Sequence, residues 1–133
     1  MGPAQSLDSV PTSDQIAKIV KEEPTFWLEG RLRSPESLLA QYGWALRRRV
    51  MDTPEVHALL IQLRDGSRSV VLNKARGTSK SDSWLIAHEV AHSLLFSNGR
   101  RWLPPSSAEE DFCDAFATFY MVALGTGSIV NAA

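Results

Sequence analysis

Two histidines four residues apart are the side chains best suited to chemistry in this sequence of 133 residues. They belong to the stretch His88-Glu89-Val90-Ala91-His92, which is an H-E-x-x-H pattern. Residues four apart lie on one face of a helix, so both imidazoles can reach the same ion. Zinc accepts imidazole nitrogen, and the glutamate can take a proton from an attacking water. The pattern therefore predicts a Zn²⁺ site with His88 and His92 as ligands and Glu89 as the catalytic base.

The alternative interpretation is that both histidines are ordinary surface or core residues of a helix. The surrounding stretch, SWLIAHEVAHSLLFS over residues 83–97, is apolar nearly all round, which is typical of a buried helix. Unpaired imidazoles are costly in such surroundings. This cost favours the metal site over the ordinary interpretation.

A catalytic zinc site has three protein ligands, and the third is expected from the acidic cluster at the start of the last predicted helix. The cluster comprises Glu109, Glu110, Asp111 and Asp114. We select Glu110 because it precedes Asp114 by four residues. Glu110 can then bind zinc while Asp114 accepts the free N–H of a ligating imidazole. Asp111 and Asp114 are the alternative ligands, and a capping box with a preceding serine is the competing use of Glu109 or Glu110.

The sequence resembles the ImmA/IrrE family of small zinc metallopeptidases over about residues 56–122, most specifically over 84–121. Members pair a His-Glu-x-x-His helix with a helix carrying Glu-x-x-Ala-Asn/Asp-x-Phe-Ala. Here the two read HEVAHSLL (88–95) and EDFCDAFA (110–117). The matching positions of the second helix are Glu110, Asp114, Phe116 and Ala117. Cys113 replaces the usual alanine, and the proline that commonly follows the second helix in the family is missing.

The resemblance implies a zinc-dependent endopeptidase of the gluzincin type, with a zincin-like minimal metallopeptidase core. It further implies site-specific cleavage of a regulatory protein, typically a helix-turn-helix repressor, in the bacterial cytoplasm. The alternative function is a non-catalytic, zinc-containing module that binds a partner in a regulatory or toxin–antitoxin-like system. The presence of Glu89 favours catalysis, because a structural zinc site needs no base at that position.

The composition limits the partners and the compartment. A formal net charge of −1 gives no electrostatic reason to expect nucleic acid or an anionic membrane surface as a partner. The single cysteine, Cys113, excludes an internal disulfide, and a small buried thiol is the simpler interpretation than an extra ligand. No secretory signal and no apolar stretch of ~20 residues is found. We therefore expect a cytoplasmic protein whose partner is a protein substrate.

The remaining sequence predicts an α+β fold, with a small antiparallel three-stranded sheet packed on helices. We expect helices near 12–22, 35–42, 83–97 and 107–124, and strands near 44–50, 56–63 and 67–72. The turn Arg64-Asp65-Gly66 predicts a hairpin between the last two strands. The domain is expected to span residues 12–124, with a disordered N-terminus over 1–11 and a loose tail over 125–133.

Two further features of the site have open alternatives. Residues 68–72 could pair with an extended substrate or form an ordinary hairpin strand. A donor that stabilises the transition state could be His57, Tyr42 or Tyr120, although each is more simply a structural residue.

Overall fold

The computed structural model describes residues 13–95 and 107–126 and confirms the α+β class. The elements are α1 (Ser13–Glu22), the 3₁₀ turn η2 (Pro24–Phe26), β1 (Trp27–Leu28), β2 (Arg31–Leu32), α2 (Pro35–Tyr42), β3 (Ala45–Arg49), β4 (Ala58–Gln62), β5 (Arg68–Asn73), α3 (Asp82–Leu95) and α4 (Ser107–Thr126). The expected N-terminal segment 1–11 lies outside the described residues, as does the expected tail from 127 onward. Residues 125 and 126 belong to α4.

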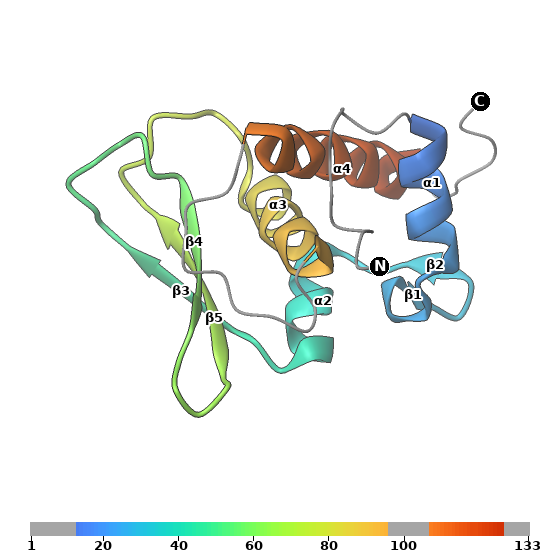
Figure 1. Cartoon of the computed structure of the whole chain (residues 1–133), viewed down its shortest axis with the longest axis horizontal. Helices are drawn as coiled ribbons and strands as arrows, with labels where there is room; N and C mark the ends of the chain where they lie inside the picture. The colour runs from blue at the N-terminus through green and yellow to red at the C-terminus, as the bar shows by residue number, and fades with distance from the viewer. Residues whose placement is uncertain (1–12, 96–106, 127–133) are drawn as a thin grey trace.

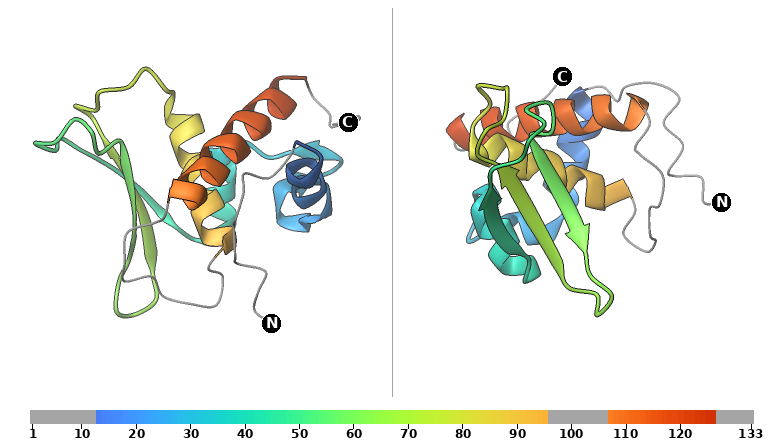
Figure 2. Two further views of the ribbon diagram at one scale, coloured as in Figure 1. Left: turned by 45° about the horizontal axis from the view of Figure 1, so that its top comes forward. Right: turned by 90° about the vertical axis from the view of Figure 1, so that its left-hand side faces the viewer.

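Helix α3 occupies the middle of the molecule. It lies between the three-stranded sheet on one side and α4 on the other, while α1 and the β1–β2 hairpin lie at the end far from the sheet (Figures 1 and 2). The apolar sequence around the two histidines follows from this position, because α3 is covered on several sides.

The three-stranded sheet has the strand order β3-β5-β4. Strands β4 and β5 are antiparallel and are joined through a turn in which Gly66 has a φ of 90°, as the Asp-Gly pair predicts. Strand β3 runs parallel to β5, so the expected all-antiparallel sheet is wrong for this pair. Because β5 is hydrogen-bonded on both sides, residues 68–72 offer no edge to an extended substrate, and of the two alternatives the structure shows the ordinary hairpin strand. A continuous apolar run such as Val70-Val71-Leu72 is typical of a central strand.

The sequence did not lead us to expect the short hairpin of β1 and β2. Trp27 pairs with Leu32 and Leu28 with Arg31. The two residues between the strands, Glu29 and Gly30, have φ values of 53° and 80°, as a type I′ turn requires. Strands of two residues are too short to show an alternation of polar and apolar side chains. The sequence signal for this hairpin is therefore limited to Gly30 in the turn.

Local side-chain contacts fix the start of α3. The Ser81 hydroxyl oxygen accepts a hydrogen bond from the Trp84 N–H at 3.1 Å, which makes Ser81 the N-cap. Asp82 forms ion pairs with Arg48 of β3 at 3.1 Å and with Arg76 at 2.9 Å. The ion pair to Arg48 links the first turn of α3 directly to the edge strand of the sheet.

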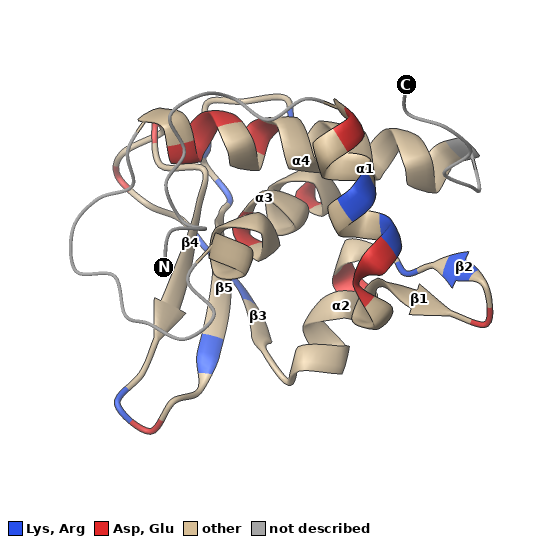
Figure 3. Ribbon diagram, turned by 45° about the vertical axis from the view of Figure 1, so that its right-hand side comes forward, with Lys and Arg blue, Asp and Glu red and all other residues tan. Residues whose placement is uncertain are grey.

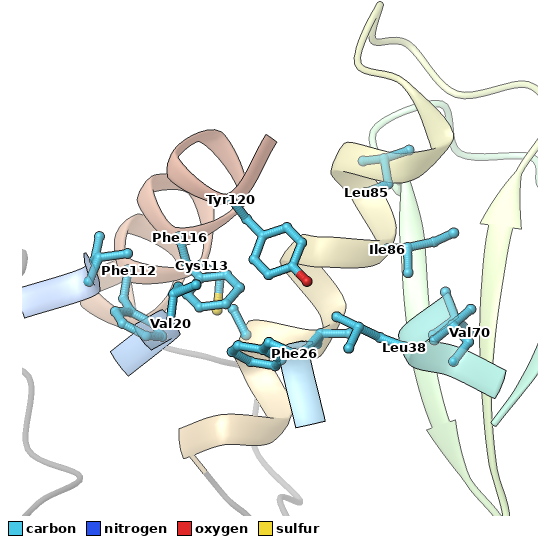
Figure 4. Close-up of a cluster of buried hydrophobic side chains, with 14 of the residues drawn as sticks. Val20, Phe26, Leu38, Val70, Leu85, Ile86, Phe112, Cys113, Phe116 and Tyr120 are labelled. Atoms are coloured by element: carbon cyan, nitrogen blue, oxygen red, sulfur yellow. The ribbon is translucent and has the colours of Figure 1, made fainter. Parts of the chain in front are cut away.

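The hydrophobic core joins both sides of α3. Phe26, Phe116 and Tyr120 pack with ring centroids 5.6–5.9 Å apart, and Figure 4 shows them between α4 and the sheet-facing residues of α3. On the other side Val70 and Leu72 of β5 are fully buried. The helix that carries the two histidines is therefore held in place by packing on two faces.

Asn73 anchors the connection between β3 and β4, and its removal should destabilise the fold. Its buried side chain accepts hydrogen bonds from the Met51 and Ala75 N–H groups and donates to the Thr53 and Val56 carbonyls, at 2.8–3.2 Å. Asn73→Ala removes these four hydrogen bonds and leaves the part-buried backbone groups without their side-chain partner. We expect the free energy of unfolding, measured in urea, to fall by about 2–4 kcal/mol.

The control is Gln62→Ala, which removes an exposed side-chain hydrogen bond to Arg68. This variant should change the free energy of unfolding by no more than about 0.5 kcal/mol. Equal effects of the two substitutions would contradict the role assigned to Asn73.

Candidate metal centre

The predicted site residues meet where α3 packs against α4. Helix α3 contributes His88, Glu89 and His92, and the first turns of α4 contribute Glu109 and Glu110. Figure 3 shows the acidic positions, in red on the ribbon, gathered at this end of α4. The two helices belong to segments separated by residues 96–106, which lie outside the described residues.

Both imidazoles and the Glu110 carboxylate converge on one point. The Nε2 atoms of His88 and His92 lie 3.2 Å apart. Glu110 Oε1 lies 3.1 Å from His88 Nε2, and Glu110 Oε2 lies 3.2 Å from His92 Nε2. A zinc ion with ligand bonds of ~2.0–2.1 Å holds tetrahedral ligand atoms about 3.3 Å apart. The donor types and the separations of these atoms therefore fit a zinc ion.

Among the acidic alternatives, the geometry favours Glu110 as the third ligand. Both of its carboxylate oxygens face Nε2 atoms, and its side chain is 44% exposed. Asp111 points outward and is exposed. Asp114 approaches His88 on its other ring nitrogen, so it faces the back of the imidazole and not the point of convergence.

A second carboxylate stands behind each histidine. Asp114 Oδ1 lies 2.9 Å from His88 Nδ1, close to the supporting position expected from the sequence. The two atoms are not aligned for a hydrogen bond, so Nδ1 is a buried polar atom without a hydrogen-bond partner. Rotation of the exposed Asp114 side chain can bring its oxygen into line. An imidazole that coordinates through Nε2 needs its Nδ1–H oriented in this way, so the arrangement suits a ligating histidine.

The sequence analysis missed the role of Glu109. Its carboxylate is buried, and Oε2 lies 2.7 Å from His92 Nδ1. Glu109 therefore takes at His92 the supporting position that Asp114 takes at His88. A usable signal existed, because Glu109 falls on the same stripe of α4 as Phe112, Cys113 and Phe116, which are buried apolar positions. A carboxylate in that stripe requires a partner.

Cys113 also lies in the cluster. His88, His92 and Cys113 each place one ligand atom within 4.8 Å of those of the other two residues. The thiol is fully buried, as expected for a small core residue. Its distance to the imidazoles shows, in addition, that these three residues could hold a metal ion.

The ionisable groups of the cluster shift one another's pKa values. Contacts with His88 and His92 hold the pKa of Glu110 well below its usual range. Burial opposes the charged form of His92, but the Cys113 and Glu110 side chains outweigh it and raise the pKa of His92 to about 11. Burial raises the pKa of the Cys113 thiol to about 11.

Glu89 is the buried carboxylate next to His88. Only 7% of it is exposed. Burial raises the pKa of Glu89, although the positive charge of His92 and His88 acts in the opposite direction. A base whose pKa is raised toward neutrality is better matched to proton transfer at physiological pH than an ordinary surface glutamate.

The candidate transition-state donors have structural partners. The buried Tyr120 hydroxyl donates to the Arg33 carbonyl at 2.6 Å. Tyr42 contacts the Thr25 hydroxyl at 3.2 Å, and burial raises the pKa of Tyr42. The His57 carbonyl accepts a hydrogen bond from the Asn73 N–H at 3.0 Å. The side-chain contacts of Tyr42 and Tyr120 agree with the simpler, structural interpretation of these two residues, whereas the contact of His57 involves only its backbone.

Glu109→Gln tests whether the buried carboxylate supports the metal ligand His92. The substitution keeps the size of the side chain but removes the charge behind the imidazole. We expect the zinc affinity, measured by competition with a chromogenic chelator, to fall about 10–100-fold. Asp111→Asn is the matched control on the exposed side of α4 and should leave the affinity unchanged. Equal affinities of both variants and the wild type would contradict a supporting role for Glu109.

Comparison of the chain with known proteins gives no related protein from which the site could be interpreted. None of the helices in the described ranges is both long and apolar enough to cross a membrane. No protein-family model, no curated protein and no solved structure matches the chain.

Proposed function

We propose that the protein is a zinc-dependent endopeptidase. The observation that carries the proposal is the convergence of the His88, His92 and Glu110 ligand atoms at 3.1–3.2 Å, together with a buried carboxylate, Glu89, that interacts electrostatically with all three residues. Two histidines and one carboxylate form an established ligand type for catalytic zinc, which keeps one position open. A carboxylate adjacent to this set has the placement of a general base.

The residues of the cluster have separate tasks in peptide hydrolysis. His88, His92 and Glu110 would hold the ion, which when bound would act as a Lewis acid toward a peptide carbonyl. Glu89 takes a proton from the attacking water and returns it to the leaving amine. Glu109 orients the imidazole of His92 through its Nδ1 atom, and Asp114 lies 2.9 Å from Nδ1 of His88.

The substrate class that fits the proposal is a regulatory protein, as the resemblance to the ImmA/IrrE family implies. Access to the site is from the side of Glu110 and Asp114, whose side chains are 44% and 57% exposed, whereas Glu109 closes the inner side. A helix-turn-helix repressor is the leading candidate, and the cytoplasm is the compartment in which the two would meet.

The experiment uses the zinc-loaded full chain with candidate repressors from the source organism and with an unbiased peptide library. New peptide termini are identified by mass spectrometry. We expect cleavage at a small number of bonds, its loss after chelation of zinc, and its return when zinc is restored. A zinc-loaded protein that leaves all repressors and the library intact would favour the alternative of a zinc-containing binding module.

A further inference from the structure

Cys113 is a metal-binding donor that the proposed three-ligand site leaves unused. Its side chain is fully buried, and its sulfur lies within 4.8 Å of an imidazole nitrogen of both His88 and His92. Thiolate sulfur is a preferred ligand of zinc. The residue also departs from the resemblance, which places an alanine here, so the thiol adds a donor where that pattern has none.

Sequence spacing brings Cys113 to the same face of α4 as Glu110. Glu110 and Cys113 are three residues apart on α4, and His88 and His92 are four apart on α3. Both spacings put the two side chains on one face of their helix, so each helix presents a pair of donors where α3 packs against α4. The two members of the α4 pair differ in access. The Glu110 side chain is 44% exposed, whereas Cys113 is 0% exposed and approaches the imidazoles from inside the protein.

From this arrangement we propose that Cys113 is a fourth zinc ligand, which closes the site formed by His88, His92 and Glu110. The proposal rests on the zinc site of the proposed function. Four protein ligands are typical of closed sites, whereas a catalytic site keeps one position free for water or substrate. While the thiolate is bound, the open position is filled, so we expect the wild type to cleave slowly, through the fraction of molecules in which Cys113 has left the ion.

Zinc K-edge X-ray absorption fine structure of the zinc-loaded full chain tests the proposal without an activity assay. The expected wild-type spectrum has one sulfur neighbour at ~2.3 Å and nitrogen or oxygen neighbours at ~2.0–2.1 Å. In Cys113→Ala the sulfur neighbour should be absent and zinc should remain bound. The zinc affinity of this variant should fall by about tenfold or more.

Cleavage provides a second readout, because an open site should be more active. Cys113→Ala is expected to cleave the library peptides faster than the wild type under identical zinc loading. The control is Thr118→Ala, an exposed position on the same helix as Cys113. This substitution removes the hydroxyl that accepts a hydrogen bond from the Trp84 indole, and it should change neither the spectrum nor the rate. Cys113→Ser replaces the alanine variant if the latter does not fold. The wild-type spectrum alone decides whether zinc has a sulfur ligand.

The outcomes separate this proposal from the function on which it rests. Bound zinc with only nitrogen and oxygen neighbours in the wild type overturns the fourth ligand and leaves the open site of His88, His92 and Glu110 intact. A folded wild-type protein that binds no zinc overturns both. A sulfur neighbour that persists in Cys113→Ala overturns the assignment to Cys113.

Discussion

Glu89→Gln should reduce the rate of peptide cleavage by about 10²–10⁴-fold while zinc remains bound, because the amide cannot accept the proton of the attacking water. The substitution conserves size, and Glu89 lies beside the ligands without being one of the three proposed for the ion. A buried carboxylate also carries a desolvation cost, and burial already raises the pKa of Glu89. We therefore expect the variant to be at least as stable as the wild type.

The measurement compares zinc content, thermal unfolding and the cleavage rate of the wild type and Glu89→Gln. Glu22→Gln, an exposed position at the end of α1, is the control and should behave as the wild type in all three. The general-base role is wrong if Glu89→Gln cleaves at the wild-type rate. Since the variant keeps its substrate-binding surface, it can also serve as a trap with which an uncut protein substrate is captured and identified.

Several elements of the fold could be predicted because their signals are local. Helix α2 begins after Ser34, whose side chain accepts a hydrogen bond from the Ser37 N–H, and it ends at Gly43, which adopts a left-handed φ of 74°. Both residues can be identified in the sequence without knowledge of the rest of the fold. The β4–β5 turn at Gly66 is local in the same sense.

The strand order could not be predicted because it depends on a connection between distant segments. Strand β3 reaches β5 only after residues 50–57 turn back, and those residues are held by the side chain of Asn73. A hydrophobic pattern cannot reveal this interaction, because Asn73 bonds backbone groups, which every residue has regardless of its side chain. The parallel pairing of β3 with β5 is the consequence.

The side chains whose proximity could be predicted are those with helical spacing. His88, His92 and Glu110 were placed by the i, i+4 rule and by the pairing of two helices, and the structure brings their donor atoms together. Glu109 was missed because adjacent carboxylates cannot be ranked by spacing alone. Their difference is burial, which depends on the angle at which α4 packs on α3.

His88→Ala should abolish stoichiometric zinc binding. The substitution removes one of the three converging donors, so the zinc affinity should fall by more than the roughly 10–100-fold expected from the loss of a supporting residue. His57→Ala is the matched control, because the hydrogen bond from the Asn73 N–H is accepted by the backbone carbonyl of His57 and is kept in the variant. Stoichiometric zinc in His88→Ala, measured by atomic emission after dialysis, would contradict the proposed ligand set.

The wild-type affinity for zinc should also increase with pH. In the ion-free protein the raised pKa of His92, about 11, keeps its imidazole protonated at neutral pH, and that proton must leave before the nitrogen can bind zinc. The lowered pKa of Glu110 means that this carboxylate is already ionised and releases no proton. Between pH 6 and 8 the apparent affinity should therefore rise by about tenfold per unit for the His92 proton, and by about a further tenfold per unit if the Cys113 thiol, whose pKa is raised to about 11, also loses its proton to the ion. An affinity independent of pH in competition titrations would show that His92 loses no proton on binding and is not a ligand.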